Sequence, residues 1–523
     1  MRPPDYALQS LRDLVERNAR LHGDDAHLVF EGRRSTFRTF AARAKRLAAA
    51  MQAYGLLPQD RISILAMNCA EFLEVYGIAE VSPYIVAPIN YRLAAPEIAW
   101  ILRDAAPRAL FIEEQYCALI DGLRAELPSI QHYICIGSNC PDWASPYESL
   151  LSGGASDISG ELPTGAHVTS ILYTSGTTGR PKGAMLPHSA MLASGETWSY
   201  ELAADVGDKV LLAMPLFHCG ARTQGLALTY RGGTIVLHRS FDALEVMRTI
   251  ERERITQVHL APTLVQQVLN LPDIDRFDLR SLKTINYAAA PMPVTVLKRA
   301  LARFGPIMIN GFGQTEGAGL TLRKHYHRPD GDARDLRRLA SVGQPNADTR
   351  LRILDQLDHE LPIGAIGEIC LQSPQNMLGY WNNSAATIET LRGGWLHMGD
   401  MGYVDEDGFT YLVDRKKDMI ISGGENVYSR EVEEALMAHA AVADAAVIGV
   451  ADERWGEAVK AIVVVKAGAA ATAELLIAHC RALIAGYKCP KSVAFVDALP
   501  RLPSGKVSKV TLRQQFRVSL DLG

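Results

Sequence analysis

Short apolar runs alternate with amphipathic stretches through most of this 523-residue chain, and this alternation constrains its fold more than any other feature. The clearest part of the pattern predicts strand, helix, strand, helix and strand at Thr256–Leu260, Pro262–Leu269, Thr284–Tyr287, Pro293–Phe304 and Pro306–Ile309. Both helices start with proline, which the first turn of a helix tolerates. Strands that alternate with helices form parallel sheets covered by helices. We therefore expect an α/β fold with a large N-terminal domain of this kind.

The alternation ends near the charged segment Asp414–Asp418, which has the composition of a linker. Beyond it the pattern predicts helix, strand, strand and helix at Ser429–His439, Ala445–Val450, Val459–Lys466 and Ala473–Ala485. Strands that follow one another directly indicate a small, separate α+β domain at the C-terminus.

The charge and cysteine content exclude several classes of protein. The chain has 54 basic and 58 acidic residues, a net charge of −4, so nothing indicates a nucleic-acid or anionic-membrane partner. Its eight cysteines lack the paired spacing of metal ligands, which favours free buried thiols in a reducing compartment. The N-terminus has no apolar leader core, and no run approaches the roughly 18 apolar residues that cross a membrane. We expect a cytoplasmic protein without a transmembrane segment.

A loop rich in glycine and hydroxyl residues follows the apolar pair Ile171-Leu172. It reads Tyr173-Thr-Ser-Gly-Thr-Thr-Gly-Arg-Pro-Lys-Gly-Ala184. Glycines let backbone N–H groups approach a phosphate, hydroxyls add donors, and Lys182 adds charge. The spacing does not match the Walker pattern. The loop therefore predicts a phosphate site of another kind, and the alternative is a flexible turn.

Five further motifs follow in order, several of them at the predicted ends of strands. They are Tyr287–Met292, Asn310–Gly317, Trp395–Asp400, the pair Asp414–Ile420 and Ser422–Tyr428, and Pro503–Lys506. A basic segment at 322–340 lies between them. Charge clusters are usually solvated, so we favour a solvated surface loop there over an anion-contacting one.

In this order and spacing the six motifs resemble the adenylate-forming superfamily of acyl-CoA synthetases, nonribosomal-peptide adenylation domains and firefly luciferases. The resemblance covers nearly the whole chain. It implies that a carboxylate attacks the α-phosphorus of ATP, that pyrophosphate leaves, and that the thiol of coenzyme A (CoA) then attacks the acyl-adenylate. It also implies a mobile C-terminal domain. The domains would span 1–414 and 418–523, joined by a hinge at 415–417 in which Lys417 matches the family's hinge position.

The resemblance also assigns the nucleotide site. Phosphate contacts would come from Thr174, Ser175, Gly176, Thr177, Thr178 and Lys182. The adenine slot would be built from Ala290, Pro291, Asn310, Gly311 and Phe312. Thr315 would contact the α-phosphate, Glu316 would hold Mg²⁺, and Asp400 with Arg415 would bind the ribose. A carboxylate oxygen suits Mg²⁺. Phe312 stands where tyrosine is common, and Met398 stands where threonine is usual, so two hydroxyls are absent.

Lys506 resembles the lysine that is essential for adenylate formation, and it would bring two anions together by electrostatic stabilisation. The pantetheine arm of CoA would pass Gly423, Gly424 and Glu425. Trp455 would contact the CoA nucleotide, and the equally good alternative is that it lies in the domain core.

His218 indicates the branch of the superfamily. Amino-acid-activating domains usually carry aspartate at this position, and histidine lacks that permanent negative charge. A plain carboxylic acid is therefore expected, and His218 would help to orient its carboxylate in the first step or would gate the acyl tunnel. The acyl pocket would be lined by His218, Cys219, Gly220, Ala288 and Gly313. Its small residues favour a medium-chain fatty, aromatic or arylalkanoic acid. Arg222 either turns away from this pocket, which we favour, or meets a polar substrate tail.

Two alternatives share every motif. One is a ligase that loads the thiol of a carrier protein, and the other is a luciferase-like monooxygenase. A non-catalytic binding protein is disfavoured because Glu316, Asp400 and Lys506 are all present. The sequence leaves open whether the chain forms a homodimer.

Overall fold

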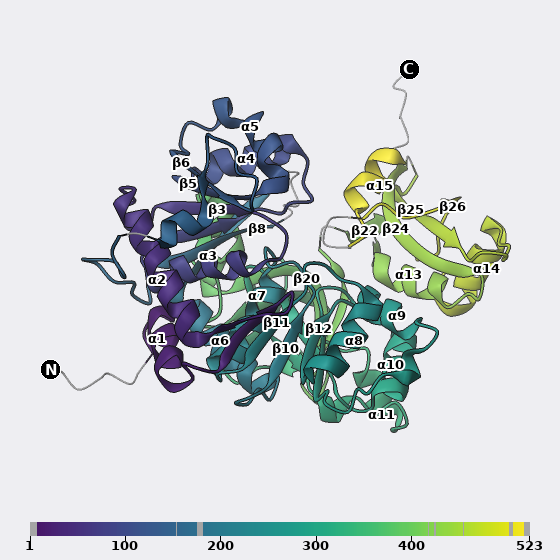
Figure 1. Ribbon diagram of the computed structural model, residues 1–523. Coiled ribbons are helices and arrows are strands. Elements are labelled where there is room, and N and C mark those ends of the chain that lie inside the picture. The colour runs from purple at the N-terminus through teal and green to yellow at the C-terminus, as the bar shows by residue number, and fades with distance from the viewer. Residues whose placement is uncertain are drawn as a thin grey trace, which may run out of the picture. The chain divides into compact units, whose positions relative to one another are not determined.

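The structure is a computed structural model, and it describes residues 8–152, 154–174, 181–416, 418–422, 425–452, 454–501 and 506–516. The chain forms two compact units (Figure 1). Unit 1 comprises residues 1–351 and 371–396, and unit 2 comprises residues 352–370 and 397–523. Residues 352–370 and 397–414 thus group with the C-terminal part of the chain. Because Lys417 lies outside the described residues, the hinge at 415–417 and the domain bounds beside it stay predictions.

One sheet of unit 1 has a parallel centre and antiparallel edges. Its strand order is β16 (Gln344–Pro345), β15 (Gly317–Leu322), β14 (Met308–Gln314), β13 (Thr284–Ala288), β12 (Gln257–Leu260), β10 (Lys209–Leu212), β11 (Thr234–Leu237), β1 (Ala26–Phe30) and β2 (Arg33–Thr36). Strands β14 to β1 pair in parallel, whereas β15, β16 and β2 pair antiparallel. The carboxyl ends of β12, β13 and β14 therefore meet at one edge.

A second sheet of unit 1 carries the residues that flank the glycine-rich loop. Its order is β19 (Gly379–Tyr380), β9 (Lys182–Pro187), β8 (Val168–Thr174), β4 (Ile85–Pro88), β3 (Arg61–Leu65), β5 (Ala109–Glu113), β6 (His132–Ile136) and β7 (Ser145–Pro146). Strands β8 and β9 are antiparallel, with Thr174 opposite Lys182. Strand β19 extends the sheet beside β9, with Tyr380 opposite Ala184.

Helices cover these sheets. They are α1 (Leu11–Leu21), α2 (Phe37–Ala53), α3 (Ala70–Val81), α4 (Ala95–Ala105), α5 (Cys117–Asp121), α6 (His188–Glu201), α7 (Cys219–Tyr230), α8 (Ala243–Glu253), α9 (Pro262–Leu269), α10 (Val294–Phe304), α11 (Ala333–Arg338) and α12 (Ser384–Thr390). Short 3₁₀ segments lie at Glu114–Tyr116, Arg124–Glu126, Tyr147–Leu151, Ile274–Arg276, Lys324–Tyr326 and Arg392–Gly394.

Side chains along β12 and β13 point alternately to the two faces of the sheet, and the two faces have different surroundings. Val258, Ile285 and Tyr287 pack into a core with α8, α9 and α10, which lie together in Figure 1. Because successive strand residues point to opposite faces, His259 and Asn286 face the other way, toward α7. The acyl pocket is expected on this second face.

Unit 2 holds most of a small sheet and all of a second one. The first has the order β17 (Arg350–Leu354), β18 (Gly367–Gln372), β20 (Leu396–Val404) and β21 (Thr410–Arg415). The second has the order β23 (Glu425–Val427), β22 (Ile420–Ser422), β25 (Gly456–Val465) and β24 (Val442–Asp452), with β26 (Ser492–Phe495) also paired to β25. Helices α13 (Ser429–Met437), α14 (Ala473–Leu483) and α15 (Lys509–Gln515) accompany it. Its core includes Val432, Val447 and Leu476.

The predicted α/β class with a smaller C-terminal α+β region is confirmed, and α9 has the predicted bounds. Strand β14 runs five residues past the predicted Ile309. It does so because Asn310 to Gln314 pair with the returning strand β15.

The basic segment 322–340 is only partly the solvated loop we expected. Arg323 forms an ion pair with Glu201, His327 is buried, and Ala333–Arg338 is helical. All eight cysteines are free thiols, and six of them are buried. Within the described ranges, no helix is both long and apolar enough to cross a membrane.

Candidate functional site

Glu316 lies in the tight turn between β14 and β15 and is 7% exposed. The Tyr380 hydroxyl donates a 2.7 Å hydrogen bond to Glu316 Oε1. Burial and the nearby Glu316 charge both raise the pKa of Tyr380, so the phenol remains a donor at neutral pH. Tyr380 therefore fixes the orientation of this carboxylate.

Lys182 contacts the ring of the same tyrosine. Its Nζ is 4.9 Å from the centroid of the Tyr380 ring, a distance suited to a cation–π contact. Thr174 faces Lys182 across the β8–β9 pair and donates a 3.4 Å hydrogen bond to its carbonyl. One end of the glycine-rich loop, Lys182, thus contacts the tyrosine that binds Glu316, and the other end, Thr174, is bonded to Lys182. Ser175, Gly176, Thr177 and Thr178 lie outside the described residues.

The residues expected to form the adenine slot lie in the middle of β14 and just after the end of β13. Ala288 pairs with Gly311, and Asn310 Nδ2 donates a 3.3 Å hydrogen bond to the Tyr287 carbonyl. Ala289 has φ +73°, which is uncommon for a residue with a side chain. The chain bends there and leaves Ala290 half-buried and Pro291 exposed. Phe312, on the next strand, is also half-buried.

The expected acyl-pocket residues cluster at the start of α7. His218 is the N-cap residue of this helix, and Cys219 and Gly220 form its first turn. The Thr315 hydroxyl lies 3.5 Å from Cys219 Sγ, so the proposed phosphate and acyl contacts adjoin. A Cβ on Gly220 would lie 2.8 Å from His259 Cε1. Gly220 is therefore small because His259 packs against it, and not only because an acyl chain needs room, as we expected.

Arg222 follows on the same helix but is turned away from the proposed acyl wall, as favoured. It forms a buried ion pair with Glu80, and its guanidinium lies 4.5 Å from the centroid of the Tyr76 ring. Its charge is therefore neutralised within the protein.

In unit 2, Asp400 and Arg415 form the pair that the resemblance implied. They lie opposite each other in the β20–β21 ladder, and Arg415 Nε is 2.6 Å from Asp400 Oδ1. Asp400 is buried. The guanidinium thus orients the carboxylate that is expected to accept the ribose hydroxyls.

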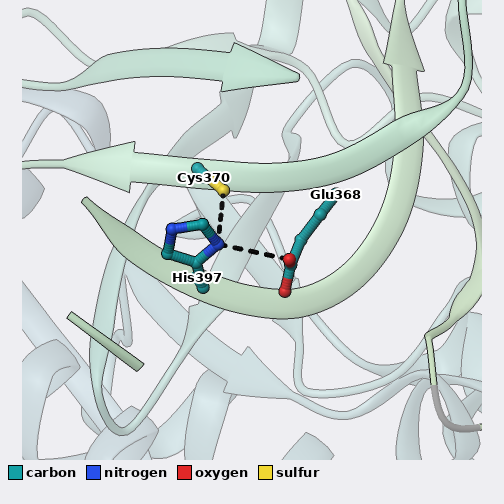
Figure 2. Close-up of side chains that lie close together, drawn as sticks. All are labelled: Glu368, Cys370 and His397. Carbon is teal, nitrogen blue, oxygen red and sulfur yellow. Dashed lines mark hydrogen bonds and ion pairs between the residues drawn. The ribbon is translucent and has the colours of Figure 1, made fainter. Parts of the chain in front are cut away.

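A cluster that our sequence analysis missed lies just before Asp400. Figure 2 shows Glu368, Cys370 and His397 with their side chains turned toward one another. His397 Nδ1 lies 3.2 Å from both Glu368 Oε2 and Cys370 Sγ. All three residues are buried. Such a set could ligate a metal ion, but Lys416 Nζ already lies 3.0 Å from Glu368 Oε2 and supplies the positive charge.

Glu368 instead supports the part of β20 that carries Asp400. Its Oε1 accepts a 3.2 Å hydrogen bond from the Gly399 backbone. Burial alone would raise the pKa of Glu368, but hydrogen bonds from His397 and Lys416 lower it to about 2. The sequence signal that could have pointed to this cluster is Glu368 itself, a glutamate within the largely apolar strand β18.

The remaining predicted residues of unit 2 lie at its surface. Trp455 is 36% exposed, with Arg454 and Lys491 at 4.7 and 5.4 Å from its ring, so the alternative that it lies in the domain core is wrong. Glu425 and Lys506 are exposed. Gly423 and Gly424, like Lys417, lie outside the described residues.

Comparison with known proteins agrees with this geometry. Residues 15–381 match the family described as AMP-binding enzyme, and residues 431–506 match the AMP-binding enzyme C-terminal domain. The chain belongs to the AMP-binding enzyme family.

Three similar proteins illustrate the range within this family. A feruloyl-CoA synthase from Amycolatopsis is 36% identical over 97% of this chain and 99% of its own. The fatty acid–[acyl-carrier-protein] ligase ScoC of Streptomyces coeruleorubidus is 33% identical over 97% of both chains. The solved structure of the anthranilate CoA ligase AuaEII with anthranoyl-AMP is 28% identical, with a TM-score of 0.87 over 99% of both chains.

These matches place this AMP-binding enzyme in the acyl-CoA synthetase branch of the adenylate-forming superfamily. It is an AMP-forming acid–thiol ligase, and its substrates include ATP and CoA.

Proposed function

We propose that this enzyme converts a medium-chain fatty, aromatic or arylalkanoic acid into its CoA thioester through an acyl-adenylate. The observation that supports this most directly is the arrangement of Lys182, Tyr380 and Glu316. An ammonium and a buried carboxylate both contact one phenol, and the ammonium belongs to the last residue of a loop suited to phosphates. A metal–triphosphate complex needs both charges.

Glu316 is suited to hold Mg²⁺, because its carboxylate is a hard oxygen ligand fixed by Tyr380. When bound, Mg²⁺ would screen the charge of the triphosphate. Lys182 and the loop beginning at Thr174 would bind the β- and γ-phosphates, and Thr315 would contact the α-phosphate. Since Thr315 also reaches Cys219, the acid and the α-phosphorus would be held side by side.

Other residues would complete the first half-reaction. Asn310, Gly311, Phe312 and the turn at Ala290–Pro291 would hold adenine, and Asp400 would accept the ribose hydroxyls. His218 would orient the substrate carboxylate. Lys506 would stabilise the charge that develops as the two anions meet.

The second half-reaction would use a different surface. Rotation at Lys417 would bring Gly423, Gly424 and Glu425 to the pantetheine arm. The Trp455 indole, with Arg454 and Lys491 beside it, offers an aromatic face and two cations to a phosphorylated nucleotide. The free cysteines fit a reducing compartment, and we place the enzyme in the cytoplasm.

The deciding experiment incubates a panel of carboxylic acids with ATP, Mg²⁺ and CoA. We expect AMP, pyrophosphate and a thioester of the expected mass, all abolished by EDTA. ADP with phosphate, and no AMP, would contradict the mechanism. Replacing CoA by a carrier protein tests the carrier-loading alternative, and light or oxidised product in air without CoA tests the monooxygenase alternative.

A further inference from the structure

Three polar side chains are buried beneath the expected acyl pocket, and we call them the polar floor: Gln224, His259 and Asn286. Each is at most 5% exposed. Asn286 Nδ2 donates a 2.9 Å hydrogen bond to Gln224 Oε1. Asn286 Oδ1, Gln224 Nε2 and both ring nitrogens of His259 have no partner among the described residues. A buried polar group without a partner costs free energy, so four such atoms in one place suggest an external one.

The sheet register places the polar floor next to the pocket. His259 and Asn286 are direct partners in the β12–β13 ladder, so their side chains share a face. Ala288 lies on that face two residues farther along β13, which is about 7 Å toward the carboxyl edge. The polar floor is therefore about one substrate length deeper than the end at which adenylation would take place.

Two glycines of the expected pocket pack closely against the polar floor. A Cβ on Gly220 would lie 2.8 Å from His259 Cε1, and a Cβ on Gly311 would lie 2.8 Å from the Trp198 ring and 3.3 Å from Asn286 Oδ1. Gly220 and Gln224 are four residues apart on α7 and so share a helix face. Residues already assigned to the acyl and adenine sites thus border the polar floor directly.

The hydrogen-bonding capacity of the polar floor does not depend on how the two amides are turned. One amide donates to the other, which leaves one free donor and one free acceptor in either orientation. Burial lowers the pKa of His259 to about 4, so its imidazole is neutral and also offers one donor and one acceptor. The polar floor can therefore pair with a neutral group that both donates and accepts.

We infer that the acid used by this enzyme carries a neutral hydrogen-bonding group, such as a hydroxyl, at the end far from its carboxylate. The inference rests on the proposed function and narrows its substrate class. Gln224 and Asn286 would recognise this group directly, with His259 beside them. A plain fatty acid would leave all of these atoms unpaired.

A second carboxylate does not fit the same position. None of the three side chains carries a positive charge at neutral pH, and the cation on this helix, Arg222, is already paired with Glu80. Burial of an unpaired charge is far more costly than burial of a hydroxyl. The distal group is therefore neutral.

The test compares 3-(4-hydroxyphenyl)propanoate with 3-phenylpropanoate, and 8-hydroxyoctanoate with octanoate. We expect kcat/KM for thioester formation to be about 10- to 100-fold higher for the hydroxylated member of at least one pair. A dicarboxylate of matched length should be poor. The inference is overturned if both unsubstituted acids are used as well as their hydroxylated partners.

Two variants with nearly the same side-chain shape test whether the polar floor causes the preference for the hydroxylated acid. Asn286→Leu and Gln224→Met should each remove most of the preference for the hydroxyl, which is measured as a larger fall in kcat/KM for the hydroxylated acid than for the unsubstituted one. The matched control is Gln257→Met, because Gln257 is also buried but lies two residues farther from the pocket on β12. It should keep the wild-type preference. If both floor variants also keep that preference, the assignment of these residues is wrong.

The outcomes separate this inference from the proposed function. If no acid releases pyrophosphate and AMP, the proposed function itself has failed. If thioesters form but the hydroxyl makes no difference, only the polar floor is refuted. Circular dichroism shows whether each variant of the polar floor is folded, and a variant that fails to fold is replaced by His259→Leu. The comparison of the acid pairs with the wild-type enzyme needs no variant and by itself decides the inference.

Discussion

The Tyr380 hydroxyl holds the carboxylate of Glu316 at 2.7 Å, although the two residues are 64 positions apart in the chain. Tyr380 belongs to the sheet that carries the glycine-rich loop, whereas Glu316 belongs to the turn after β14 in the other sheet. One hydrogen bond therefore connects the two sheets of unit 1 at the point where the metal–triphosphate is proposed to bind.

Removing this hydroxyl should weaken adenylation. Tyr380→Phe keeps the ring beside Lys182 but leaves Glu316 free to rotate. A hydrogen bond to a charged group contributes about 2 kcal/mol, so we expect adenylation to fall about 10- to 30-fold at limiting Mg²⁺. ATP–pyrophosphate exchange across a Mg²⁺ titration measures it. Tyr147→Phe is the matched control, because Tyr147 donates a 2.7 Å bond to the buried Glu74 away from the site. Equal losses in both variants would contradict a role at the metal.

Lys506→Ala should separate the two half-reactions. Loss of one preorganised charge-stabilising group lowers adenylation by about 10²-fold or more. Thioester formation from pre-made acyl-adenylate should change much less, because the lysine is proposed to have moved away by then. Lys466→Ala, at an exposed lysine bonded to the Ala440 carbonyl, is the control. Equal losses in both half-reactions would refute the two-state assignment.

Lys417→Pro should have the opposite effect. Proline fixes φ near −65° and so blocks a large backbone rotation at the proposed hinge. Adenylate should still form, measured by pyrophosphate release, while transfer to CoA should fail. Lys417→Ala, which leaves the backbone free to rotate, should transfer normally. Normal thioester synthesis by the proline variant would show that the hinge lies elsewhere.

The proposed acyl pocket should discriminate against short acids. Each missing buried methylene forgoes about 0.8 kcal/mol, so four of them are worth about 3 kcal/mol, or about 10² in kcat/KM. Medium-chain or arylalkanoic acids should therefore exceed acetate by that factor. Acetate or propionate as the best substrate of the wild type would refute the pocket assignment.

Gly220→Ala should narrow the same pocket, because the new Cβ would displace His259. Overpacking costs about 1–3 kcal/mol, so we expect kcat/KM for an arylalkanoic acid to fall about 10-fold, with little change for acetate. The control is Gly225→Ala, on the same helix beside Ile235. Equal losses for large and small acids would contradict a place on the acyl wall.

Acid should destabilise the protein through His259. Its pKa is lowered by burial from 6.5 to about 4, so below pH 6.5 the unfolded chain binds a proton that the folded protein does not. Stability is thus lost as the pH falls from 6.5 to 4, by roughly 3 kcal/mol from this group. Urea unfolding of His259→Leu should show a smaller loss over this range than the wild type. Identical pH slopes would mean that His259 is not buried as a neutral side chain.

Much of the fold could be predicted because it is encoded locally. Period-two and period-3.6 patterns marked β12, α9, β13 and α10, and proline fixed the starts of the helices. The extension of β14 could not be foreseen, since a glycine-rich stretch such as Asn310–Gly313 extends only when a returning strand pairs with it. The same limit applies to 333–338, where Asp332 caps a short helix within a segment we expected to be a loop.

The sequence by itself determined the class of chemistry, because residues suited to binding phosphate, metal and ribose lie in short motifs whose order and spacing resemble those of the adenylate-forming superfamily. Thr174, Lys182, Glu316 and Asp400 could be named through that resemblance. Only the tertiary structure decided which distant side chains support two of them: Tyr380 for Glu316, and Glu368 for the part of β20 that carries Asp400. The tertiary structure also brought together the polar floor of Gln224, His259 and Asn286. These contacts arise from the pairing of β13 with β12, of β19 with β9 and of β18 with β20. Such long-range pairing leaves no periodic trace in the sequence, so these contacts could not be predicted from it.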